Sequence, residues 1–118
     1  MKQRHTIFLT FIIALTMATT AMAASVQLVW DPVTDTRVVG YILERCTGTT
    51  CTNFVPIATN IVGTTFNDTT VQPATAYRWQ VRSADAQGGT SAPSNVVTFL
   101  LPAAPLPVPA NLRGTIVP

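Results

Sequence analysis

Alternation of apolar and polar side chains at a period of two runs through most of the chain. The clearest example spans residues 77–83, where Tyr77, Trp79 and Val81 alternate with polar residues. This period predicts a half-buried strand whose three apolar side chains face the core. Beyond residue 23, no apolar spacing of three and four residues persists, so we expect an all-β fold.

Further short strands are predicted between turns that contain Gly, Pro, Asn or Asp. Within one of them Tyr41 and Leu43 share a face, and both are expected in the core. Short strands at even spacing are typical of a β-sandwich or a β-barrel. The predicted ranges are 26–30, 38–46, 51–58, 64–67 and 95–101.

The first 23 residues have the pattern of a secretory signal. Residues 1–4 carry positive charge, residues 7–18 are apolar except for Thr, and residues 21–23 read Ala-Met-Ala. This order predicts a signal peptide over 1–23, cleaved after Ala23. An uncleaved membrane anchor is the alternative, but the apolar run is shorter than a membrane span requires. We expect a secreted, periplasmic or cell-surface protein.

Removal of this segment changes the charge balance. Two of the chain's seven Lys and Arg residues, Lys2 and Arg4, lie within it, as does the single histidine, His5. Five arginines then balance five acidic residues, and the formal net charge is zero. A balanced, sparsely charged surface has no basic patch for nucleic acid or for anionic lipid. We therefore expect no nucleic-acid partner, and no membrane association after signal cleavage.

Catalytic and metal-binding chemistry is poorly supported after residue 23. That part of the chain has no His or Lys, the residues that supply most general bases and amine nucleophiles. Asp31 and Asp35 flank one loop, but both stand in ordinary turn contexts. Two cysteines without His fall short of the four ligands of structural zinc. We expect a non-enzyme with no cofactor and no metal.

Cys46 and Cys51 flank the four residues 47–50, which include a glycine and suit the loop of a β-hairpin. Such a hairpin brings the two side chains together, and export places them in an oxidising compartment. A disulfide is predicted, with reduced or intermolecular thiols as the alternatives.

Arg78 and Arg82 point outward from the strand over 77–83, which would neighbour the strand that carries Glu44. A cross-strand ion pair accounts for this placement. A recognition surface is the alternative, because Arg is enriched in interfaces.

From about residue 26 to residue 101 the chain resembles the fibronectin type III domain. The marks of the resemblance are residues 28–32 (LVWDP), 40–45 (GYILER), 71–77 (VQPATAY), 81–89 (VRSADAQGG) and 91–95 (SAPSN). It implies an immunoglobulin-like sandwich of two sheets, with Trp30 and Tyr41 packed at the centre of the core. It also implies that Tyr77 is a tyrosine-corner residue, whose hydroxyl bonds to backbone upstream.

One departure from that family concerns the opening strand. Members carry a strand before the Trp strand, whereas cleavage after Ala23 would leave only Ala24 and Ser25 there. We therefore expect a domain over 24–101 whose opening strand is missing. A sheet edge without a partner invites another strand.

The C-terminal segment 102–118 supplies a candidate for that strand. A proline-rich stretch over 102–109 predicts a stiff, extended linker. Residues 109–117 then resemble the opening strand that such domains carry at their start. Leu112, Ile116 and Val117 are its candidate assembly residues. A tail without fixed structure, or the start of a truncated second domain, are the alternatives.

These expectations give a first hypothesis of function: an exported fibre subunit in which each tail completes the next copy's sheet by donor-strand complementation. The partner would be another copy of the chain or another protein. A monomeric binding or spacer module is the alternative, using loops near Asp35 and over 87–94. An accessory module of a secreted carbohydrate-active system, with carbohydrate as its partner, is a further alternative.

Overall fold

The structure, a computed structural model, describes residues 24–118, and the predicted signal peptide over 1–23 lies outside the described residues. Six strands follow one another along the described chain, which contains no helix. They are β1 (Val26–Val29), β2 (Val38–Thr47), β3 (Val55–Ile61), β4 (Thr65–Asp68), β5 (Ala76–Asp85) and β6 (Val97–Leu100). The all-β prediction is confirmed, since the alternating pattern is satisfied by strands.

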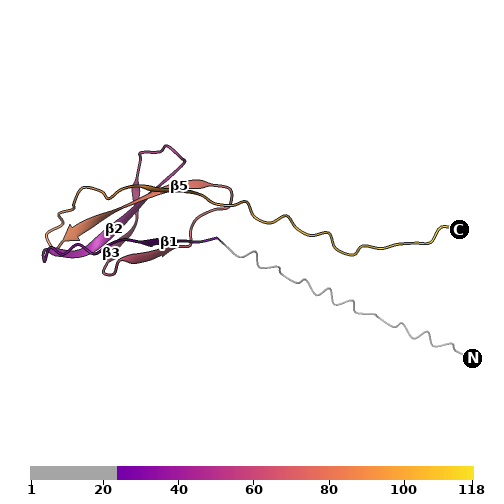
Figure 1. Ribbon diagram of the computed structural model, residues 1–118, viewed down its shortest axis with the longest axis horizontal. Helices are drawn as coiled ribbons and strands as arrows, with labels where there is room; N and C mark the ends of the chain where they lie inside the picture. Colours follow the sequence, from indigo (N-terminus) through magenta and orange to yellow (C-terminus); the bar gives the residue numbers. More distant parts are fainter. Residues whose placement is uncertain (1–23) are drawn as a thin grey trace, which may run out of the picture.

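The strands form two antiparallel sheets (Figure 1). The smaller sheet pairs β1 with β4, and the larger has the order β3-β2-β5-β6. Their inner faces pack on a single core, because each sheet is apolar on one side only. The predicted two-sheet sandwich is therefore confirmed.

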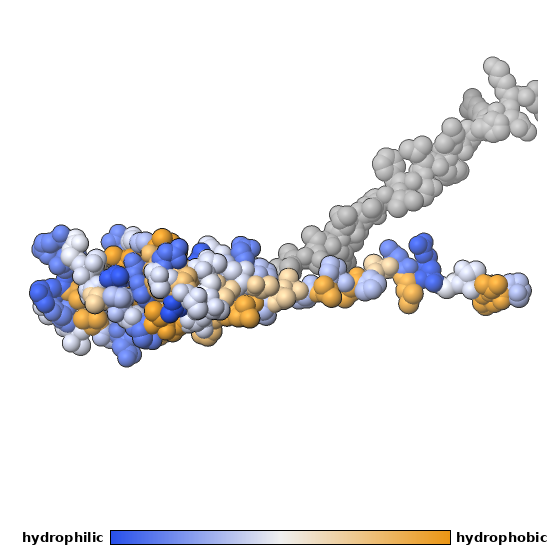
Figure 2. Space-filling view, turned by 90° about the horizontal axis from the view of Figure 1, so that it is seen from above, coloured by the Kyte–Doolittle hydropathy of each residue, from blue (hydrophilic) through white to orange (hydrophobic). Residues whose placement is uncertain are grey.

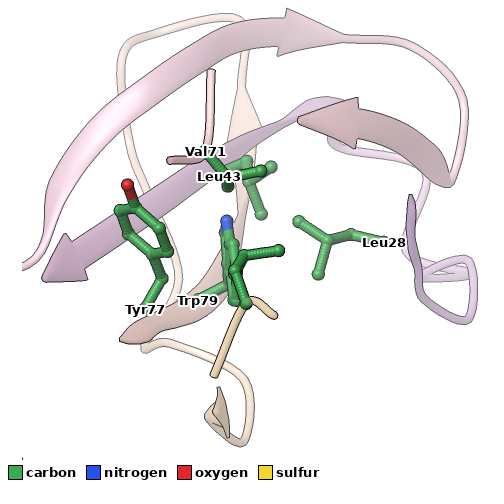
Figure 3. Packing of buried hydrophobic residues seen from close by; sticks show 6 residues of the cluster. Leu28, Leu43, Val71, Tyr77 and Trp79 are labelled. Carbon is green, nitrogen blue, oxygen red and sulfur yellow. The ribbon is translucent and has the colours of Figure 1, made fainter. Parts of the chain in front are cut away.

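The core centres on Trp79 and Leu43, which are 1% and 2% exposed (Figure 3). Leu28 of β1 reaches them from the smaller sheet, and Tyr77 of β5 lies beside Trp79. Tyr41 is also buried, while Val81 is partly buried and packs against the cluster. The two inner faces thus meet around one indole ring.

The prediction that Trp30 lies at the centre of the core was wrong. Trp30 directly follows β1, is only partly buried, and meets Tyr41 edge to face with ring centroids 5.5 Å apart. The indole that fills the centre belongs to Trp79 on β5, which has strand neighbours on both sides. Trp30 is less covered because only one strand flanks β1 in the described chain.

A buried carboxylate joins the two sheets. Asp68, the last residue of β4, accepts hydrogen bonds from Arg45 Nη1 at 2.8 Å and from Trp79 Nε1 at 3.0 Å. Both donors belong to the larger sheet. Thr70 donates to the same carboxylate from its backbone N–H and its hydroxyl. Burial alone would raise the pKa of Asp68, but these hydrogen bonds outweigh burial and lower it.

The hairpin between β2 and β3 is closed by a disulfide from Cys46 to Cys51, with Cα atoms 6.0 Å apart. The third strand was predicted from residue 51, but β3 begins at Val55 because the disulfide loop takes up the intervening residues. Arg78 lies across this loop, donating to the Cys51 carbonyl and stacking over Phe54.

Two tyrosine hydroxyls fix loops at the ends of the sandwich. Tyr77 Oη accepts a hydrogen bond from the backbone N–H of Gln72 at 2.9 Å, the upstream contact that the tyrosine-corner resemblance implies. Tyr41 Oη accepts one from the N–H of Val33 at 2.8 Å. Each hydroxyl therefore satisfies a backbone donor that no strand pairs.

The last hydrogen bonds that join the C-terminal part of the chain to the sandwich lie at Leu101 and Pro102. The Leu101 N–H donates to the Thr75 carbonyl, and the Ala74 N–H donates to the Pro102 carbonyl. Beyond them the chain runs away from the sandwich without strand structure (Figure 1). Over the described range, no helix is long and apolar enough to cross a membrane.

Candidate strand-acceptor site

The smaller sheet has only two strands in the described chain, so both its edges are open, and the β1 edge is the one considered as an acceptor. Strand β1 pairs with β4 on one side only. The Trp30 N–H donates to the Thr64 carbonyl, and Leu28 lies opposite Phe66 in the same register, so the backbone groups of Trp30 and Leu28 face β4. Backbone groups alternate between the two sides of a strand, so those of Gln27 and Val29 face the open edge. These groups are available to a further strand.

A groove of about 510 Å³ lies beside this edge, which we call the edge groove. It passes between β1 and the segment 91–95, and Leu43 and Trp79 are among the core residues that line it. Its lining combines apolar residues such as Val33, which is 47% exposed, and Pro93 with polar ones such as Ser91 and Asn95. The sandwich is therefore not fully closed along this side.

Trp30 carries an unsatisfied donor within this site. Its side chain lines the edge groove, and its indole Nε1 is buried without a hydrogen-bond partner in the described chain. A buried N–H without an acceptor costs about 1–3 kcal/mol.

The C-terminal segment carries apolar side chains that are exposed to solvent. Leu112, Ile116 and Val117 are 100%, 94% and 85% exposed. Figure 2 shows hydrophobic residues spaced along this extended segment, away from the sandwich. No hydrogen bond joins residues 103–118 to the sandwich in the described chain. The predicted assembly residues are thus exposed together on one extended segment, residues 103–118, which we call the arm.

The arm leaves the sandwich at the end where β1 begins. Val26 at the start of β1 lies opposite Asp68, and Leu100 at the end of β6 lies opposite Ala76. Only a short connection separates Asp68 from Ala76, so both strand termini lie at one end of the module (Figure 1). An arm that folded back on its own module would therefore run parallel to β1.

On a neighbouring copy the arm could instead run antiparallel to β1. If a second module is stacked beyond the exit end in the same direction, the arm reaches it where its β1 finishes and runs antiparallel to that strand. The proline-rich residues 102–109 span about 25 Å at the rise of polyproline. Their stiffness favours an onward course over a reversal.

The other predicted residues lie away from this edge. Cys46 and Cys51 close the β2–β3 hairpin, and Arg82 pairs with Glu44 at 2.8 Å on the outer face of the larger sheet. Burial opposes ionisation of Glu44, but the hydrogen bonds from Arg82 and Gln80 outweigh it and lower its pKa. These groups stabilise the scaffold, and of them only Gln80 lines the edge groove.

The loop acids do not converge on a catalytic pair. Asp35 binds Arg37, with 2.7 Å between the carboxylate and the guanidinium, and this hydrogen bond lowers the pKa of Asp35. Asp31 is exposed and makes no ion pair in the described chain. Within residues 24–118, no group of three or more His, Cys, Asp or Glu side chains could hold a metal ion.

A second, smaller hollow of about 320 Å³ lies between the Asp35 loop and the turn near Asp85. Its lining combines polar residues, among them Arg37, Ser83 and Thr90, with the apolar Val33 and Val38. Asp85 shapes the turn by accepting backbone hydrogen bonds from Gln87 and Gly89. This hollow lies between the loops near Asp35 and over 87–94, which the alternative of a binding module would use.

Comparison with known proteins identifies the architecture. No protein-family model matches the chain, and no curated protein matches it either. Among solved structures, it is similar to a fibronectin type III-like protein from Clostridium thermocellum, with a TM-score of 0.57 and 23% identity over 71% of this chain and 83% of that one. A myokine structure matches with a TM-score of 0.53 and 23% identity over 68% and 84%. The chain therefore has a fibronectin type III-like fold.

Proposed function

We propose that this chain is an exported, non-catalytic structural subunit that assembles head to tail into an extracellular fibre. In each junction, residues 109–117 of one copy pair with the open β1 edge of the next copy and cover its edge groove. The disulfide is consistent with export, because such bonds persist in oxidising compartments. Fibronectin type III-like folds typically serve as non-catalytic modules, which fits a structural role.

The observation that carries this proposal is the match between an uncovered edge and an uncovered strand on the same chain. The edge lacks a partner strand in the described residues, and the arm exposes Leu112 and Ile116 almost completely. Antiparallel pairing is open to the arm only on another copy, because the arm leaves its own module where β1 begins. Repetition of such a head-to-tail contact produces a filament rather than a closed dimer.

The test is the mass of the exported protein, purified with and without residues 108–118. Light scattering should detect a series of oligomers for the complete form and a monomer for the shortened form. A peptide of residues 108–118, added in excess to the complete form, should shorten the oligomers because it occupies the acceptor edges. Monomeric behaviour of both forms at all concentrations would refute the proposal.

A monomeric binding module is the second candidate, supported by the smaller hollow beside Asp35 and Asp85. A hollow of this size, with mixed charged and hydroxyl groups, suits a small polar ligand such as a carbohydrate. This function predicts binding that survives deletion of residues 108–118. It also predicts loss of that binding in an Arg37→Ala variant, which leaves the edge groove intact.

A further inference from the structure

The open edge and the arm can pair in several registers, and their side chains select one of them. Resting on the function proposed above, we infer that the arm binds with Ile116 opposite Leu28, Gly114 opposite Trp30 and Arg113 opposite Asp31 of the next copy. This register identifies Asp31 and Trp30 as the residues that determine which strand the edge accepts.

The first restriction comes from the face of each strand. Leu28 is buried and Trp30 packs against the core, whereas the intervening Val29 is 71% exposed, although all three border the edge groove. On the arm, Leu112, Gly114 and Ile116 share one face because side chains alternate along a strand. Antiparallel partners lie on the same face of a sheet, so a shift of one residue would expose all three. Only registers that differ by two residues remain.

The second restriction is steric. In the inferred register the smallest residue of the arm, Gly114, faces Trp30, and Leu112 lies beyond it, toward the groove residue Val33. A shift of two residues toward the start of β1 would place Leu112 against Trp30. It would also place Ile116 opposite Val26, which does not line the groove.

Nothing in the described chain requires a glycine at position 114. Its backbone is outside the left-handed region, and a side chain built there would meet no atom within 4 Å. The small residue is accounted for if it must fit against the Trp30 indole of another copy.

The third restriction is charge. Three ion pairs occupy Arg37, Arg45 and Arg82 with their partners, whereas Arg113 and Asp31 make none in the described chain. Arg113 is the single charged residue of the segment 102–118, and Asp31 directly follows the acceptor strand and its Trp30. The inferred register sets these two opposite charges across from each other, where Asp31 is exposed beside the groove. A shift of two residues toward the start of β1 would set Arg113 against Val29 instead.

Charge reversal tests the register. The probe is a peptide of residues 108–118, and the acceptor is the protein shortened by those residues, whose six strands are all retained. Asp31→Arg in the acceptor, or Arg113→Asp in the peptide, should each weaken binding about 3- to 10-fold. The two changes together should restore binding to within about twofold of the original value.

Gly114→Val in the peptide should weaken binding at least about tenfold, because it adds bulk against Trp30. Thr115→Val, on the outward face, is the matched control and should change binding less than about twofold. If the original peptide binds but the paired reversal does not restore affinity, or Gly114→Val binds normally, the register is refuted while the proposed function stands. If the original peptide does not bind at all, the proposed function itself is refuted.

Discussion

Replacement of Ile116 by Ser tests the strength of the proposed junction. Ile116 is 94% exposed on the arm, and it would become buried in the edge groove of the next copy. Complete burial of an Ile side chain contributes about 1.5–3 kcal/mol. Since each 1.4 kcal/mol changes an equilibrium constant tenfold, Ile116→Ser should weaken binding of the arm by about 10- to 150-fold.

The measurement is isothermal titration calorimetry of a peptide of residues 104–118 with the protein shortened by its arm. Leu106→Ser in the same peptide is the matched control, because Leu106 is 89% exposed but lies in the proline-rich linker. It should change the affinity less than about twofold. Equal losses for the two variants would mean that the peptide binds through general hydrophobicity, and the reasoning from an inserted strand would be refuted.

Two further predictions concern the scaffold. Asp68→Asn should reduce the free energy of unfolding by about 3–5 kcal/mol, measured by urea denaturation, because it leaves the Arg45 cation without its buried partner. Since the pKa of Asp68 is lowered in the folded state, its contribution should be present above about pH 4 and lost as the pH falls further. Below about pH 4 the free energy of unfolding should fall less for the Asn variant than for the original protein. An equal fall in the two proteins would contradict the assignment of this pH dependence to Asp68. Replacement of Cys46 and Cys51 by Ser should cost about 2 kcal/mol, because the closed loop is short, and a loss above 5 kcal/mol would contradict that view.

The fold could be predicted because its strands have one apolar face each. The alternation around Tyr77 and Trp79 identified β5, one of the two ten-residue inner strands of the larger sheet, and the spacing of turns indicated the sandwich. Strand limits were less accurate where covalent and tertiary contacts override local pattern, as at the disulfide loop before Val55. The central indole was assigned to Trp30 instead of Trp79, because period alone does not say which strand has neighbours on both sides.

The candidate site was only partly readable from sequence. The strand-like pattern of the arm is local, so Leu112 and Ile116 could be singled out, and their role in assembly stays a prediction. The edge groove depends on how β1 and the segment 91–95 are placed across from each other, and no local pattern predicts that. The buried pairing of Asp68 with Arg45 likewise joins residues far apart in the chain.

The position of Asp68 has a consequence for how such a fibre would come apart. Asp68 is the last residue of β4, which is the one described neighbour of the acceptor strand β1. Its carboxylate binds Arg45 and Trp79 and so links β4 to the larger sheet. Acid that protonates this carboxylate would weaken its bonds to Arg45 and Trp79, and so the attachment of β4 to the larger sheet. The apolar contacts of the arm do not titrate and would not be changed directly. Depolymerisation in strong acid, reversible on neutralisation, is thus the behaviour that this buried anchor would impose on the assembly.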